Sequence, residues 1–147
     1  MVIVFPDDSK DVIDDIRDAI GRDVVFVTIT VSGCPICTLD PITDHSTDSF
    51  CAVCSGLYWI PTPTYNTIIA HITWGNVDEL SWSSGGYQFD GDARVQIEYT
   101  ISNLDIVDRS VYVHVDSKIM EIKNFILRGV QSINRILIDM IEKEKST

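Results

Sequence analysis

Positive charge is scarce in this sequence of 147 residues, which holds 11 lysine and arginine residues against 22 aspartate and glutamate residues. The formal net charge of −11 at pH 7 repels phosphate, which argues against sequence-independent binding of nucleic acid. No stretch approaches the roughly 18 apolar residues that span a membrane. The first residues, MVIVFPDDSKD, contain neither a basic leader nor an apolar segment long enough for a secretion signal. We therefore expect a protein made and kept in a reducing cytoplasm, without membrane contact.

Sequence patterns typical of catalysis are also missing. The serines occur in no nucleophile-elbow pattern, and the glycines of SWSSGGYQFDGD (residues 81–92) are not followed by the Lys-Ser/Thr pair of a phosphate-binding loop. His71 and His114 lie in alternating, partly apolar segments, so we interpret both as packed or surface strand residues. We predict no catalytic residue and no organic cofactor, and we interpret residues 81–92 as a mobile loop or hairpin.

An amphipathic helix is predicted at residues 8–21. Val12, Ile13, Ile16 and Ile20 recur at helical spacing and form one apolar stripe, while the aspartates between them face water. Asp8 or Ser9 can cap the start, and Gly21 can end the helix in the left-handed conformation. 

The rest of the chain reads mainly as strands joined by turns. The strands are expected within residues 23–31 and 59–141, with a hairpin turn at Asp116–Lys118 and a last strand in which Ile136, Ile138 and Met140 alternate. Val95, Ile97, Tyr99 and Ile101 predict one face of a half-buried strand. About six successive strands without intervening helices indicate an antiparallel barrel or sandwich. We predict a single domain over residues 1–147: a small antiparallel β-barrel with an N-terminal helix and a loop inserted at 32–58.

Every cysteine lies in the segment CPICTLDPITDHSTDSFCAVCSGLYW, residues 34–59. Cys34 and Cys37 form one CxxC pair, and Cys51 and Cys54 form another, with the 13 residues 38–50 between them. Zinc favours four ligands at tetrahedral corners, and two such pairs supply four thiolates. The spacer is slightly below the common range of about 15–20 residues but is long enough for a small hairpin. We predict a structural Zn²⁺ held by these four cysteines, because a filled coordination sphere leaves no position for substrate.

Other readings of the cysteines remain open. Disulfides would form if the protein were exported, and an iron site of rubredoxin type uses the same four thiolates. A redox CxxC is less well supported, because it should open a helix in a βαβ unit. His45 lies between the pairs and is a conceivable ligand, but four cysteines already fill the sphere, so we interpret it as an exposed loop residue.

Three segments together resemble a group of tailed-bacteriophage virion proteins from the neck, between capsid and tail. The cysteine segment is similar to a pattern CPxCxxDPxTxxSxDxxCxxCxGxGY, with Tyr58 and Trp59 at its final glycine and tyrosine. GGYQFDGDARVQIEY (residues 85–99) is similar to a glycine, tyrosine and GD pattern before a strand. VDSKIMEIKNFILRGVQSINRILIDM (residues 115–140) is similar to a closing hairpin with an RGxQxxNR turn.

This resemblance implies a structural protein of the head-closure (stopper) or head–tail connector family, not an enzyme. Such proteins form homo-oligomeric rings around the DNA channel, next to the portal or its adaptor on one side and the tail on the other. In a ring of such subunits, we expect the cysteine loop and residues 81–92 to be interface elements. DNA would pass through the channel without sequence-specific binding, and the protein would be assembled in the host cytoplasm and reside in the virion. The alternatives are a cytoplasmic zinc-ribbon module that docks on another protein, and a tail terminator.

Overall fold

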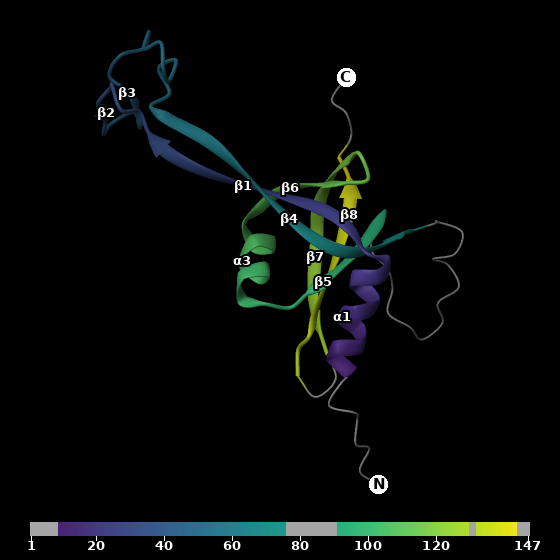
Figure 1. The fold of residues 1–147 in the computed structure, drawn as a ribbon. Helices are drawn as coiled ribbons and strands as arrows, with labels where there is room; N and C mark the ends of the chain where they lie inside the picture. Colours follow the sequence, from purple (N-terminus) through teal and green to yellow (C-terminus); the bar gives the residue numbers. More distant parts are fainter. Residues whose placement is uncertain (1–8, 76–90, 130–131, 144–147) are drawn as a thin grey trace. The chain divides into compact units, whose positions relative to one another are not determined.

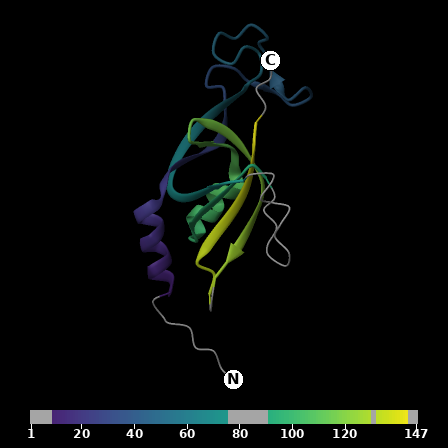
Figure 2. The ribbon, with the colours of Figure 1, turned by 90° about the vertical axis from the view of Figure 1, so that its right-hand side faces the viewer.

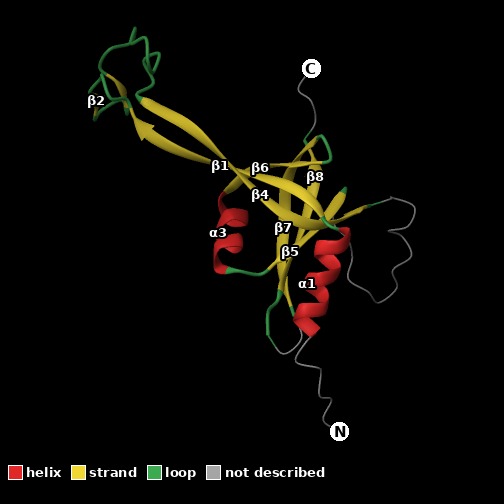
Figure 3. Cartoon of the chain, in the orientation of Figure 1, coloured by secondary structure: helices red, strands yellow, loops and turns green. Residues whose placement is uncertain are grey.

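The computed structural model describes residues 9–75, 91–129 and 132–143. The elements are α1 (Ser9–Ile20), β1 (Arg22–Gly33), β2 (Leu39–Asp40), β3 (His45–Ser46), β4 (Trp59–Trp74), β5 (Ala93–Glu98), α3 (Ile101–Arg109), β6 (Ser110–Val115), β7 (Lys118–Arg128) and β8 (Arg135–Glu142) (Figures 1 and 3). Within the described residues, neither helix has the length and apolar character needed to cross a membrane. Position 8 and most of the predicted interface loop lie outside the described residues.

Six strands close into an antiparallel barrel in the order β1-β4-β5-β8-β7-β6, and β2 and β3 form a separate two-stranded sheet. The predicted mainly β fold with a barrel and an N-terminal helix is therefore confirmed. The chain divides into two compact units. We call residues 28–64 the cysteine unit, and residues 1–27 with 65–147 the barrel unit. The cysteine unit is wider than the predicted insertion at 32–58, because it includes the second half of β1 and the first part of β4.

The core of the barrel unit forms where alternating apolar side chains of neighbouring strands meet. Val95 of β5 pairs with Ile138 of β8, and Ile97 pairs with Ile136, and all four side chains are fully buried. The predicted alternation of β8 is thereby confirmed. The hairpin between β6 and β7 is confirmed as well, with Val115 paired to Lys118 across a two-residue turn.

The segment after β5 departs from the prediction. The strand ends at Glu98, and residues 101–109 form α3, a helix that the alternating pattern did not predict. The Thr100 hydroxyl accepts a hydrogen bond from the Asn103 N–H at 3.0 Å and so caps the helix. Ile101, expected on the buried strand face, is 82% exposed, whereas Val107 points into the barrel core. The hydrogen-bonded cap at Thr100 and the burial of Val107 therefore favour a helix over the predicted strand in this segment.

Helix α1 forms as predicted but buries a different side chain. Val12, Ile16 and Ile20 of the apolar stripe are about half exposed, whereas Arg17 among them is 3% exposed. The helix lies at the periphery of the barrel in two perpendicular views (Figures 1 and 2).

The end of α1 also differs from the prediction, because Gly21 is not left-handed. The structure requires glycine for close approach: a Cβ there would lie 2.2 Å from the Arg17 carbonyl oxygen and 2.8 Å from the Ile69 side chain.

Candidate metal centre

The four cysteines belong to two turns of the cysteine unit, one at residues 34–37 and one at residues 51–54. Cys34 directly follows β1, and its N–H donates to the carbonyl oxygen of Tyr58 at 2.8 Å, which ties the start of the loop to its end. The N–H of Ser55 donates to the Cys51 carbonyl oxygen at 2.8 Å and closes the second turn. These backbone bonds hold the two CxxC pairs beside each other.

A short hairpin occupies the spacer between the pairs. Leu39 and Asp40 of β2 pair with Ser46 and His45 of β3. Within the turn, the Asp40 carboxylate accepts from the Ile42 N–H at 2.9 Å. Part of the backbone of the polar spacer is thus hydrogen-bonded within the spacer itself.

The sulfur geometry fits a single tetrahedral ion. All four Sγ atoms lie within 4.8 Å of one another. The Sγ atoms of Cys34 and Cys51 are 3.9 Å apart, and those of Cys37 and Cys54 are 3.8 Å apart. A tetrahedron with metal–sulfur bonds of about 2.3 Å has edges of about 3.8 Å. A disulfide needs sulfurs about 2.05 Å apart, and all four cysteines are free thiols. The cluster can therefore bind a metal ion, and the disulfide reading is not supported.

Hydrogen bonds shift the pKa values of the Cys37 and Cys51 thiols in opposite directions. The pKa of Cys51 is lowered to about 6, first by the thiol of Cys37 and then by backbone N–H groups including that of Cys54. The pKa of Cys37 is raised to about 12, mainly because its thiol donates to Cys51. Burial raises the pKa of Cys54, but backbone N–H groups, first that of Tyr58, outweigh burial and lower it. Donors aimed at the sulfurs stabilise thiolate charge, as a metal centre requires.

Little besides the cysteines forms the core of this unit. Cys34, Cys51 and Cys54 are buried, and Cys37, Tyr58 and Ile60 pack around them. A core of this size cannot order a loop without a further source of stability.

Tyr58 stands where the resembling pattern has glycine, and its backbone has a φ of 68°. Glycine adopts this left-handed region without the steric cost that a Cβ incurs. The side chain packs on the cysteine cluster and makes an edge-to-face contact with Trp59, with ring centroids 5.0 Å apart. A Cβ on Gly33 would lie 2.7 Å from the Tyr58 hydroxyl oxygen, so Gly33 accommodates this ring.

The histidines lie outside the cluster. The exposed His45 has its Nδ1 2.6 Å from the Thr43 carbonyl oxygen and is not among the clustered ligand atoms, as predicted. His114 makes an edge-to-face contact with Tyr112. His71 lines a pocket beneath α1 that the sequence did not reveal. An arginine within an apolar stripe, Arg17, was the available signal for that pocket.

No protein-family model, curated protein or solved structure matches this chain.

Proposed function

We propose that this chain is a structural protein of the tailed-phage neck. It forms a homo-oligomeric ring between the portal or its adaptor and the tail, and it closes the head around the DNA channel. The cysteine cluster holds a structural Zn²⁺, because four thiolates are a donor set typical of zinc and leave no open coordination position for a reaction. Its task is to fold the cysteine unit, as metal binding supplies the folding free energy that a small core lacks.

The observation that carries the assembly proposal is the exposure of apolar side chains in the cysteine unit. Ile42 is 91% exposed and Phe50 is 95% exposed. Further exposed apolar side chains of the same unit are Ile29, Val31, Ile36, Val53, Leu57 and Trp59. Large exposed apolar side chains that gather in one region are typical of protein–protein contacts. A metal-stiffened unit that presents them suits a contact between neighbouring subunits.

The acidic character of the chain supports the proposed location of the protein around the DNA channel. A net charge of −11 repels the phosphate backbone, so DNA can slide past without being held. The resemblance of the cysteine segment, the segment before β5 and the closing hairpin to neck proteins points to the same location.

Electron microscopy of intact particles at side-chain resolution tests the proposal directly. We expect density for a ring of this chain at the neck, with the cysteine unit against a neighbouring subunit or ring. Ile42→Ser combined with Phe50→Ser should abolish incorporation into particles without loss of bound zinc. Val111→Thr, which alters an exposed apolar residue of β6, is the matched control and should assemble normally. If the purified protein stays monomeric and virions lack it, the neck proposal fails.

A zinc-ribbon interaction module is the second candidate, favoured by the same exposed apolar side chains. It predicts one stable partner outside the virion, recovered by pull-down with the wild-type chain and lost with the Ile42→Ser/Phe50→Ser variant.

A further inference from the structure

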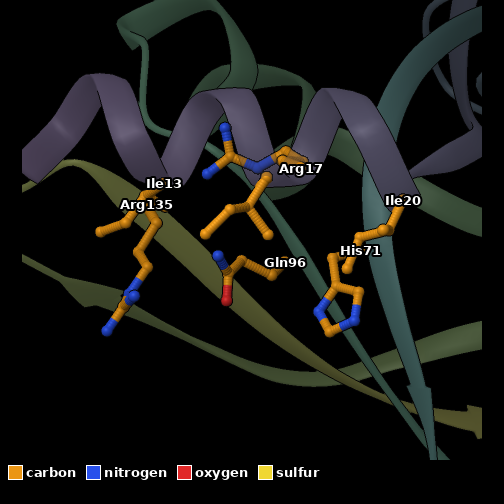
Figure 4. Close-up of a pocket in the computed structure, with 7 residues that line it drawn as sticks. Ile13, Arg17, Ile20, His71, Gln96 and Arg135 are labelled. Carbon is orange, nitrogen blue, oxygen red and sulfur yellow. The ribbon is translucent and has the colours of Figure 1, made fainter.

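A pocket of about 220 Å³ lies between helix α1 and the outer face of the barrel, entirely within the barrel unit. Figure 4 shows Ile13, Arg17 and Ile20 on the helix side of the pocket and His71, Gln96 and Arg135 on the strand side. The lining residues are Ile13, Ile16, Arg17 and Ile20 of α1, His71 of β4, Gln96 of β5 and Arg135 of β8. Gln96 alternates with core residues of β5, which places the pocket outside the barrel core.

Two arginines of this pocket have buried donors that find no acceptor in the described part of the chain. Arg17 Nη1 donates to Asp14 at 2.7 Å, but its Nε and Nη2 have no hydrogen-bond partner among the described residues. The buried Nε of Arg135 also lacks a partner there. Buried donors of folded proteins are paired in the great majority of cases, so these groups point to an acceptor from outside the described residues.

The charge balance around the pocket specifies an anion. None of the described residues that line it is acidic, although the chain as a whole is strongly acidic. The nearby Asp14 carboxylate is shared between Arg17 and Lys10, whose Nζ lies 2.6 Å away. Lys10 also pairs with Glu98 at 3.1 Å. Asp14 therefore compensates Arg17 only in part, and Arg135 adds a second guanidinium to the lining.

The apolar surroundings and the size of the pocket indicate which kind of molecule bears the anionic group. Ile16 and Ile20 flank the pocket and are about half exposed, and Val12 continues the exposed surface along the helix. A pocket of this size is smaller than the roughly 300–1,000 Å³ typical of small-molecule sites and suits a side chain. A free small acid would leave the aliphatic surface uncovered, whereas a peptide segment would cover it.

We propose that this pocket binds a glutamate or aspartate side chain of another protein chain. The carboxylate accepts hydrogen bonds from Arg17 and Arg135, and aliphatic neighbours in the bound segment cover Val12, Ile16 and Ile20. Guanidinium groups suit this role because their fixed fork of donors matches the two oxygens of a carboxylate. The inference is independent of a place in the virion, since it rests on the barrel unit alone.

Side-chain NMR of the full chain tests the proposal. The Nε–Hε signals of Arg17 and Arg135 are followed while the peptide acetyl-Ala-Leu-Glu-Leu-Ala-amide is added. We expect both signals to shift and saturate. The same peptide with glutamine in place of glutamate should bind at least about tenfold more weakly, because it loses a charge-assisted hydrogen bond. Butanoate, which lacks the aliphatic neighbours, should bind more weakly as well.

Variants distinguish peptide binding in the pocket from nonspecific charge attraction. Arg135→Gln should weaken binding of the glutamate peptide by at least about tenfold while the barrel stays folded. Arg17→Gln should have an effect at least as large if it folds. Arg109→Gln is the matched control, because Arg109 is an exposed arginine of α3 that is ion-paired with Asp105, and it should leave binding unchanged.

Several results would overturn the inference. They are the absence of any shift with the glutamate peptide, equal binding of the glutamine peptide, and equal binding by Arg135→Gln. Binding of butanoate as tight as that of the peptide would exclude a polypeptide ligand. Tighter binding of inorganic phosphate would exclude a carboxylate site.

Discussion

Removal of one thiolate from the metal cluster should unfold the cysteine unit and leave the barrel intact. Cys51→Ser is the sharpest change, because Cys51 is a buried member of the cysteine cluster whose Sγ lies 3.9 Å from that of Cys34. The two cores are separate: the barrel residues do not include the cysteines, and the cysteine core contains only Tyr58 and Ile60 besides the sulfurs. If the cluster holds the proposed ion, its loss should remove nearly all of the stability of the cysteine unit and little of the stability of the barrel unit.

The size of the effect follows from the metal. A structural Zn²⁺ contributes about 10–16 kcal/mol of apparent binding free energy at pH 7 in small zinc domains. At a free metal concentration 1,000 times the dissociation constant, the bound state gains about 4 kcal/mol over the metal-free state. Amide exchange from the cysteine unit should thus slow by about 1,000-fold in the presence of metal.

Hydrogen exchange read by NMR or mass spectrometry measures this ratio. The N–H groups of Cys34, Ser55 and Leu57, which donate to carbonyl oxygens within the cysteine unit, report on the unit. Amides of the β5–β8 ladder report on the barrel. Wild-type protein should contain one metal ion per chain, and an absence of colour excludes an iron–thiolate centre.

Val53→Ser is the matched control, because Val53 is an exposed residue of the same turn and not a ligand. It should keep both the metal and the protection. If Cys51→Ser binds no metal, yet keeps native protection over residues 34–58 and assembles normally, the structural-metal interpretation is refuted.

Three further predictions concern the barrel unit. Asp139→Asn should lower the free energy of unfolding, measured with denaturant, by about 3–5 kcal/mol. The reason is that the Asp139 carboxylate is 2% exposed and accepts two hydrogen bonds from Arg94. A loss below about 1 kcal/mol would contradict this prediction. Ser117→Gly should raise the unfolding free energy by about 1 kcal/mol, since Ser117 has a φ of 69° in the hairpin turn, and an unchanged midpoint would argue against strain there. Burial raises the pKa of Asp14, but hydrogen bonds from two basic side chains of α1 outweigh it and lower the pKa below its ordinary value of 3.8. Its stabilisation is complete above that value and disappears as the pH falls through the folded pKa, so Asp14→Asn should flatten the acid limb of the stability curve relative to wild type.

Local patterns in the sequence predicted much of this structure. The spacing of the cysteines indicated the cluster, because a CxxC turn brings two sulfurs to one side and two turns complete a tetrahedral set. The alternation of Ile136, Ile138 and Met140 identified β8, since the buried face of a strand repeats every second residue. The turn at Asp116 followed from the same local logic.

The features that the sequence did not reveal depend on contacts between distant segments. The alternating pattern continues through Tyr99 and Ile101, and nothing local indicates that Val107 instead fills the barrel core. No local pattern indicates that Arg17 is buried, because its burial depends on strands more than 50 residues further along the chain. The amphipathic pattern of a helix identifies the residues that share one face. It does not identify which of these residues the neighbouring sheet buries.

The two long strands β1 and β4 link these findings. In β1 the buried residues run from Val24 to Thr28, apart from the partly exposed Val25, whereas every residue from Ile29 to Gly33 is exposed. In β4 the buried residues, Ala70 and Ile72, lie in the second half. Each strand therefore contributes one part to the barrel core and exposes apolar side chains in the other, although β-branched residues occur throughout. Burial in strands of this composition is normally the reason for their apolar character. Among the described residues, Ile29 and Val31 of β1 and Trp59 of β4 stay exposed in the other halves, and the assembly proposed above would give these apolar side chains a partner.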